Sequence, residues 1–147
     1  MTIPQAATQP GSAGVRRTRV RVRYAETDRM GVVYYANYLV WFEVARTDWL
    51  RQGGSSYRDM EREGTALPVI EAHCEYRQPA RYDDEIEIAA RGTLLTPARV
   101  RFDYEVTRIA DNTLAAVGHT VHAAVDVDGK PRRLPPRVQG LLAWERP

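Results

Sequence analysis

The sequence predicts an α+β domain in which an antiparallel sheet of five strands is wrapped around one long central helix. Three observations carry this prediction. Residues 37–52 have helical periodicity and are the most apolar segment of the chain. One segment of period two precedes them and four follow, and the turns between the last four are short, as they are between antiparallel neighbours. Because the helix is apolar on most of its sides, we expect the sheet to enclose it.

The alternation of apolar and polar residues sets the expected bounds of each element. In the first strand, Val20, Val22 and Tyr24 should share one buried face while arginines occupy the other. Asn37 is a favourable N-cap for the helix, and the two glycines after residue 52 are a typical stop. The expected strands are 18–24, 67–77, 84–90, 99–109 and 113–127, and the expected short helices are 55–63 and 138–144.

Composition favours one cytoplasmic domain. Of the 147 residues, 44% are hydrophobic, which suffices for a single core over residues 17–147, and we expect residues 1–16 to form a disordered polar tail. Cys74 is the single cysteine, so the chain has no internal disulfide and suits a reducing compartment. No apolar run of about 18 residues predicts a membrane span. A net charge of +2 gives little reason to expect nucleic-acid binding.

The loop before the central helix carries the most informative polar residue. Asp28 lies between the end of the first strand and the start of the helix, where unpaired N–H groups and the helix dipole provide partial positive charge. Such a helix start can polarise a thioester carbonyl, while Asp28 attacks the carbonyl or activates water. Gly31 has no side chain to block the approach. The alternative role for Asp28 is that of a turn former bonded to nearby backbone amides.

The segment Tyr24-x-x-Thr-Asp-x-x-Gly-Val-Val-Tyr-x-Ala-Asn-Tyr38 resembles the signature of the 4-hydroxybenzoyl-CoA thioesterase and YbgC family. The resemblance continues in the helix (Glu-x-Ala-Arg-Thr), at residues 79–84 and at residues 130–135, and it covers residues 17–137. It implies a hot-dog fold and an enzyme that hydrolyses a small or medium acyl-CoA or an aroyl-CoA, without a cofactor or metal. Two positions depart from many YbgC-like members, since Tyr35 replaces a histidine and Glu26 replaces an aspartate.

The resemblance also implies roles for individual residues. The catalytic carboxylate falls on Asp28, and the amide that receives the thioester carbonyl falls on the backbone N–H of Tyr35, with Gly31 beside them. This favours catalysis over a turn role for Asp28. The candidate substrate-binding residues are Tyr24, Tyr34, Asn37 and, for the phosphates of coenzyme A, Arg132.

Two other functions remain possible for the same fold. The chemistry of a hot-dog hydratase or dehydratase is associated with a histidine and a carboxylate that flank the central helix. This loop and helix contain no histidine. A non-catalytic acyl-CoA binding module would lack the carboxylate. We expect the three histidines to be ordinary sheet residues and Cys74 to be a core residue, because it has no helix start or base beside it.

The sheet also predicts an assembly, either a homodimer or a homotetramer made of two dimers. Five strands around one helix leave edges that must be paired or covered. Hot-dog domains that resemble this one commonly pair side by side. A single domain of this size also has little depth for an acyl chain and a pantetheine arm. We therefore expect the active site to lie at a two-fold boundary between subunits.

Overall fold

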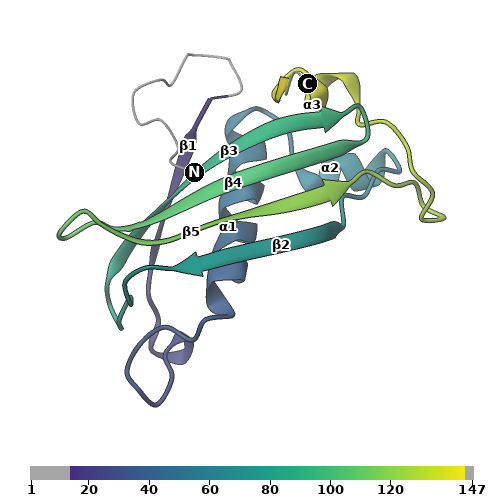
Figure 1. Cartoon of the computed structure of the whole chain (residues 1–147). Helices are drawn as coiled ribbons and strands as arrows, with labels where there is room; N and C mark the ends of the chain where they lie inside the picture. Colours follow the sequence, from purple (N-terminus) through teal and green to yellow (C-terminus); the bar gives the residue numbers. More distant parts are fainter. Residues whose placement is uncertain (1–13, 145–147) are drawn as a thin grey trace.

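The computed structural model describes residues 14–144, and in it helix α1 (Asn37–Gln52) lies against one face of an antiparallel sheet (Figure 1). The order of the strands across the sheet is β1-β3-β4-β5-β2. The strands are β1 (Arg16–Arg21), β2 (Val69–Tyr76), β3 (Glu85–Thr96), β4 (Arg99–Arg108) and β5 (Thr113–Ala123). This arrangement confirms the predicted α+β class and the hot-dog fold.

Aromatic side chains of α1 form the centre of the core. Phe42 stacks on Tyr104 of β4 with ring centroids 4.2 Å apart, and Trp49 meets Phe102 edge-on at 5.5 Å. All four side chains are almost fully buried. Burial of such large rings contributes most of the free energy that holds a helix on a sheet. The helix is therefore fixed in rotation, and this decides what its N-terminus faces.

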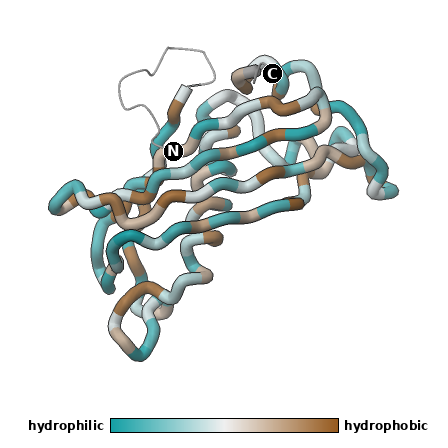
Figure 2. The backbone as a smooth tube through the Cα atoms, in the orientation of Figure 1, coloured by the Kyte–Doolittle hydropathy of each residue, from teal (hydrophilic) through white to brown (hydrophobic). Residues whose placement is uncertain are grey.

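The sheet does not enclose the helix, which corrects the expectation from its apolar sequence. Leu39, Val40 and Val44 lie on the side of α1 that faces away from the sheet and keep 39%, 48% and 39% of their surface exposed. A single sheet covers about half of a helix, so an apolar residue on the other side needs another partner. Figure 2 shows hydrophobic segments along α1 and at the start of β2.

Strand β3 is longer than predicted: it continues through Gly92, whereas the predicted strand stopped before this residue. A Cβ atom at Gly92 would lie 2.6 Å from Leu142 and 3.2 Å from Trp49. The missing side chain therefore makes room for these two residues and does not end the strand. Strand β5 is shorter than predicted: it ends at Ala123, and beyond it Val125 makes only isolated bridges.

The C-terminal segment forms two short elements in place of the helix predicted over 138–144. Helix α3 (Pro136–Gln139) has proline at its first position, and Gly140 follows its last residue. Strand β6 (Ala143–Trp144) then pairs with β3 in parallel, beyond the part of β3 that β1 covers. Both β1 and β6 thus protect the β3 side of the sheet. The outer edge of β2 is not paired with any described strand.

The remaining differences lie near the ends of predicted elements. The first strand ends at Arg21, and Tyr24 begins a 3₁₀ turn, η1 (Tyr24–Glu26), where it is 78% exposed and does not face the core. Helix α2 (Tyr57–Arg62) starts at the N-cap Ser56, close to the prediction. Of the predicted tail, residues 1–13 lie outside the described residues, while Arg16 opens β1. No helix within residues 14–144 is long and apolar enough to cross a membrane.

A chain of polar groups is buried under the sheet. The Tyr104 hydroxyl and Thr120 Oγ1 lie 2.7 Å apart, and Thr120 Oγ1 lies 2.8 Å from His122 Nε2. His122 Nδ1 lies 3.0 Å from the Leu67 carbonyl, so Nδ1 carries the proton and Nε2 accepts from Thr120. Burial lowers the pKa of His122 to about 4. The imidazole is therefore neutral at neutral pH.

This depressed pKa predicts a loss of stability in weak acid. His122 in the unfolded chain takes up a proton below pH ~6.5, whereas in the folded chain it stays neutral to about pH 4. The free energy of unfolding should therefore be highest above pH ~6.5 and should fall by up to about 3 kcal/mol as the pH drops towards 4. Urea titrations at several pH values would measure this slope.

The slope should be smaller in His122→Gln than in the wild type, since the substitution removes the buried imidazole. All samples need the same protein concentration, because subunit association also contributes to apparent stability. Equal slopes in the wild type and His122→Gln would contradict the assignment.

Candidate active site

A short hairpin places Asp28 just before the N-terminus of α1. Thr27 pairs with Val33 in an antiparallel bridge, and the Asp28 amide donates to the Val32 carbonyl at 2.9 Å. The hairpin is attached to the connection between β2 and β3 through the Val33 amide, which donates to the Ala80 carbonyl at 2.8 Å. The loop predicted from the sequence is therefore an ordered hairpin that is bonded to this connection.

The Asp28 carboxylate is held by its own turn. Its Oδ1 accepts the Met30 amide at 2.8 Å and the Val32 amide, more weakly, at 3.4 Å. Within residues 14–144, Oδ2 has no hydrogen-bond partner in the structure, so this oxygen is available to a ligand or a water molecule. The turn role that the sequence allowed for Asp28 is thus real, but it uses only one of the two oxygens.

Gly31 completes this turn. Its amide donates to the Asp28 carbonyl at 3.0 Å, and its φ is +77°, a conformation that other residues rarely adopt. A Cβ atom at Gly31 would meet nothing within 4 Å. The glycine therefore serves the backbone conformation, and the space above it is open, as an approach for substrate requires.

The same turn occurs once more, at the other end of the chain. Asp126 Oδ1 accepts the amides of Asp128 at 2.9 Å and Lys130 at 3.0 Å, and Gly129 has a φ of +81°. The turn itself is consequently a general structural device. What distinguishes Asp28 is its position next to the start of a long buried helix.

The N-terminus of α1 presents free backbone donors. Its N-cap is Ala36, which has no capping side chain, and no acceptor in the described part of the chain is bonded to the amide of Tyr35 or Ala36. Asn37 is not the N-cap, which corrects the prediction. It is the first residue of the helix, and its side-chain amide donates to the Glu26 carbonyl at 2.9 Å. The Tyr35 amide therefore retains its donor capacity next to the positive end of the helix dipole.

Glu26 connects the parts of the site, and its role was not foreseen from the sequence. It is only 6% exposed. One carboxylate oxygen accepts the Arg23 amide at 2.7 Å, and the other accepts Trp41 Nε1 of α1 at 3.1 Å. Its carbonyl also accepts the Tyr34 amide at 2.8 Å. The acidic residue within the family motif was the available signal, but only the fold shows that it is buried.

Aromatic side chains surround the Tyr35 backbone. Tyr34 and Tyr35 have ring centroids 4.7 Å apart, and Tyr76 of β2 packs edge-on against Tyr35 at 6.4 Å and Tyr38 at 5.0 Å. The Tyr76 hydroxyl donates to the Tyr35 carbonyl at 2.9 Å. The end of β2 is thereby fixed to the start of α1. Tyr24 does not join this group, since its ring contact is with Tyr82, at 5.8 Å.

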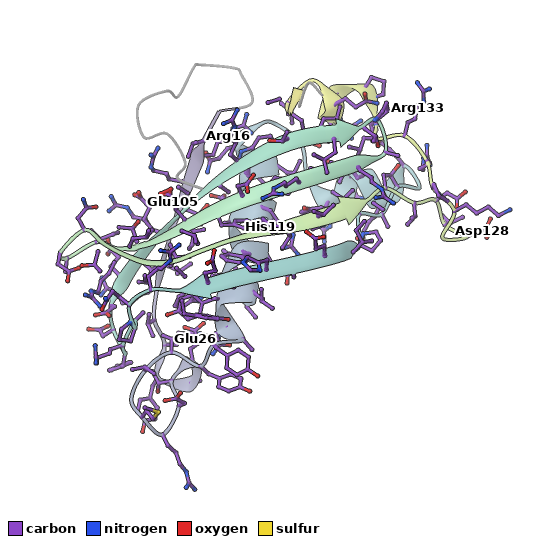
Figure 3. All side chains as sticks on the ribbon, viewed as in Figure 1. Arg16, Glu26, Glu105, His119, Asp128 and Arg133 are labelled. Atoms are coloured by element: carbon purple, nitrogen blue, oxygen red, sulfur yellow. The ribbon has the colours of Figure 1, made fainter. Side chains whose placement is uncertain are left out.

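Arg132 lies at the opposite end of the domain from Asp28. Its guanidinium donates to the Gly64 carbonyl at 2.9 Å, just after α2. Figure 3 shows Arg133 and Asp128 far from Glu26, which marks the Asp28 end. The sixteen residues of α1 separate the two ends by about 24 Å. Arg132 therefore lies well away from Asp28 of its own subunit.

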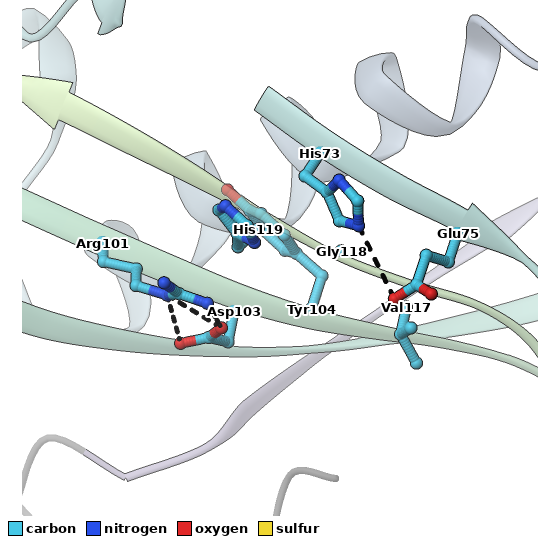
Figure 4. Close-up of a pocket in the computed structure, with 8 residues that line it drawn as sticks. All are labelled: His73, Glu75, Arg101, Asp103, Tyr104, Val117, Gly118 and His119. Atoms are coloured by element: carbon cyan, nitrogen blue, oxygen red, sulfur yellow. Dashed lines mark hydrogen bonds and ion pairs between the residues drawn. The ribbon is translucent and has the colours of Figure 1, made fainter. Parts of the chain in front are cut away.

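Two of the three histidines, His73 and His119, form a separate cluster on the outer face of the sheet. The rings of His73 and His119 stack 5.3 Å apart above a pocket of about 200 Å³, and Arg101 and Asp103 form an ion pair at 3.0 Å in the same pocket (Figure 4). His119 is also bonded to Glu71 at 2.7 Å. Within residues 14–144, no group of three histidine, cysteine, aspartate or glutamate side chains is placed to hold a metal ion. The polar side chains of this cluster thus interact with one another.

Cys74, predicted as a core residue, is half-buried on β2 and packs against the core. Burial raises the pKa of its thiol, so the thiolate that a nucleophile needs is disfavoured. Among the described residues the thiol has no catalytic base beside it: its neighbour on the strand is Tyr76, whose own pKa is raised by burial.

Comparisons with known proteins identify the family of this chain. The family model described as the Thioesterase-like superfamily matches residues 22–144. The acyl-CoA thioester hydrolase YbgC of Escherichia coli is 38% identical over 81% of this chain and 89% of its own. YneP of Bacillus subtilis is 47% identical, over 48% of this chain and 51% of its own. The DHNA-CoA thioesterase of Staphylococcus aureus superposes with a TM-score of 0.77 at 35% identity, over 81% of this chain and 80% of its own.

Proposed function

We propose that this chain, which belongs to the thioesterase-like superfamily, is an acyl-CoA thioesterase that hydrolyses its substrate at Asp28. The observation that carries this proposal is a fixed carboxylate with a free Oδ2 in the hairpin that leads into a helix N-terminus, where the Tyr35 amide is unbonded. Relatives named for acyl-CoA hydrolysis support the activity. The reaction needs neither a metal nor a cofactor, and a cytoplasmic location is part of the proposal.

The groups present suffice for hydrolysis. The Tyr35 amide binds the thioester oxygen as a hydrogen-bond donor and stabilises the oxyanion as negative charge develops. Asp28 Oδ2 either removes a proton from an attacking water or attacks the carbonyl carbon itself. The carbon–sulfur bond then breaks, and coenzyme A leaves as a thiolate, which needs little protonation because a thiol is much more acidic than an alcohol.

A hydratase or dehydratase is less well supported. Such chemistry needs a general base or acid such as histidine near the helix start, in addition to a carboxylate. All three histidines lie on β2 and β5, two of them on the outer face and His122 within the buried chain. The binding-module alternative is tested by the same experiment as the enzyme.

The Asp28 carboxylate can be tested against its structural twin, Asp126. Asp28→Asn and Asp126→Asn keep the amide oxygen that each turn uses, so both variants should fold and lose similar, small amounts of stability. Only Asp28→Asn should lose activity, by about a hundredfold or more in kcat/KM. Thiol release from a panel of acyl-CoAs, together with melting temperatures, measures both effects. Equal activity in the two variants would show that Asp28 is only a turn former.

We also propose that two subunits pair through β2. It is the edge strand, and Val69 and Ile70 at its start are 44% and 50% exposed. Pairing with a second copy satisfies the free backbone groups of this edge and covers the exposed side of α1. A two-fold axis makes such a pair antiparallel. The dimer would then have twice the 16.7 kDa of the chain.

Charge decides between the two central registers of this pairing. Residues opposite each other in an antiparallel pair point to the same face, so the axis passes beside one residue. With Ala72 on the axis, Glu71 of one copy faces His73 of the other. With His73 on the axis, Glu71 faces Glu75, and like charges in that position repel. We therefore place Ala72 on the axis.

This register brings the two ends of the domain together. Tyr76 then lies opposite Pro68 of the partner subunit, and Tyr76 holds the Tyr35 backbone. The loop of Arg132 is tied to the segment before β2, because Val125 bridges both Ala66 and Pro131. Arg132 of the partner subunit thus becomes a candidate for the phosphates of coenzyme A.

Cysteine cross-linking tests the register. In a Cys74→Ser background, Ala72→Cys should form a covalent dimer on mild oxidation, because opposite Cα atoms lie about 4.5–5.5 Å apart, within disulfide range. His73→Cys in the same background should cross-link much less. More efficient cross-linking of His73→Cys than of Ala72→Cys would place His73 on the axis. Failure of both, with a scattering mass of one chain in an active sample, would refute pairing through β2.

A further inference from the structure

Two histidines lie opposite each other on the outer face of the sheet, next to its β2 edge. His73 of β2 is paired with His119 of β5 in the register of the two strands, and their rings stack 5.3 Å apart (Figure 4). Their side chains are 52% and 19% exposed, so an ion in solution can reach both. Imidazole nitrogen is a common protein ligand of transition metals. The pair is therefore a candidate for metal binding.

Glu71 adds a carboxylate to this pair. Its Oε2 lies 2.7 Å from His119 Nε2, and the Glu71 side chain is 59% exposed and so can move. Two ligand atoms of a tetrahedral Zn²⁺ ion, each about 2.0–2.1 Å from the metal, lie about 3.3 Å apart. The two side-chain atoms therefore need to separate by only about 0.6 Å for an ion to replace their hydrogen bond.

One chain provides only part of the coordination. His73 Nε2 lies 3.6 Å from Glu75 Oε2, so its ring is turned towards Glu75. Within residues 14–144, no group of three possible ligand side chains converges on one point. A third ligand must therefore come from outside the chain.

The proposed dimer supplies this third ligand. With Ala72 on the axis, Glu71 of one chain lies opposite His73 of the partner subunit, with Cβ atoms about 4.5–5.5 Å apart. Residues that lie opposite each other in an antiparallel pair point to the same face. Glu71, His119 and the partner's His73 are thus brought together on the outer face. The two-fold axis repeats the arrangement, which gives two equivalent sites per dimer.

The ligand set is typical of zinc. Two imidazole nitrogens and one carboxylate oxygen, with water as a fourth ligand, suit Zn²⁺, whereas Mg²⁺ and Ca²⁺ prefer oxygen ligands alone. Glu75 lies beside His73 and can orient its ring, as carboxylates do for many metal-bound histidines. Arg101 lines the same pocket, but its charge is compensated by Asp103 at 3.0 Å.

We propose that the dimer binds two Zn²⁺ ions on its outer face, each held by Glu71 and His119 of one subunit and by His73 of the partner subunit. The inference rests on the proposed pairing through β2 and is independent of the thioesterase activity. The site lies on the face of the sheet opposite α1, so the ion takes no part in hydrolysis. It joins the two edge strands.

Calorimetric titration of the metal-free protein with Zn²⁺ tests the ligands. At pH ~8, where imidazole in water is neutral, the wild type should bind one ion per chain. Glu71→Gln, His73→Gln and His119→Gln should each bind at least about tenfold more weakly, whereas Glu63→Gln, an exposed glutamate after α2, should bind like the wild type. Melting temperatures show that each variant folds. Equal affinity in all five proteins, or no binding by the wild type, would overturn the proposal.

A mixed dimer tests whether the ligands come from two chains. His73→Gln and His119→Gln chains, co-expressed with two different tags that contain no histidine, can be isolated as a heterodimer. One of its two sites combines Glu71 and His119 of the first chain with His73 of the second. Binding should therefore return, with one ion per heterodimer and the wild-type affinity. A heterodimer that binds no better than its parent variants would place all the ligands in one chain and overturn the proposal.

The dimer itself provides a further readout. An ion that binds only the dimer lowers the concentration at which the subunits dissociate. At a free Zn²⁺ concentration of ten times Kd, two sites should lower the dissociation constant of the dimer about a hundredfold, and Glu71→Gln should show no such shift. Sedimentation measures both. An unchanged dissociation constant in the wild type would contradict a shared site. No readout uses catalysis, so failure of the site and failure of the hydrolase are distinguishable.

Discussion

The buried carboxylate of Glu26 is the interaction on which the geometry of the site depends. It accepts the backbone amide of Arg23, which follows β1, and the indole N–H of Trp41, while its carbonyl accepts the Tyr34 amide and the Asn37 side chain. Burying a carboxylate costs several kcal/mol unless it is fully hydrogen-bonded. The hairpin and the helix must therefore keep one relative position, because any other would leave this charge unsatisfied.

The role proposed for Asp28 comes from the surroundings of its turn and not from the turn itself. The Asp28 and Asp126 turns have the same hydrogen bonds and the same left-handed glycine. Of the two, only the Asp28 turn adjoins the start of α1, whose N-cap lacks a capping side chain. The aromatic core of α1 and the Tyr76 bond to the Tyr35 carbonyl hold that helix start in place. An ordinary turn thus becomes a candidate for catalysis through long-range packing.

The sequence predicted those features that depend on local residue patterns. The span of α1, the α+β class and the position of Asp28 followed from period and motif. The extension of β3 through Gly92 could not, because it depends on Leu142 and Trp49, which are distant in sequence. Nor could the burial of Glu26, or the exposure of Val40 and Val44, since an apolar helix pattern does not show how many of its sides one sheet covers. The separation of Arg132 from Asp28 likewise could be seen only in the three-dimensional structure.

Hydrogen–deuterium exchange of the Glu26→Gln protein tests most directly whether Glu26 positions the site. The amide group of Gln can accept from Trp41 but must turn its NH₂ towards the Arg23 amide, so one of the two bonds is lost. We expect faster exchange in residues 27–38 and unchanged exchange in β3, β4 and β5, with a loss of activity on the same preparation. Unchanged protection of residues 27–38 would contradict this role, because the hairpin would then be held in place by contacts other than those of Glu26.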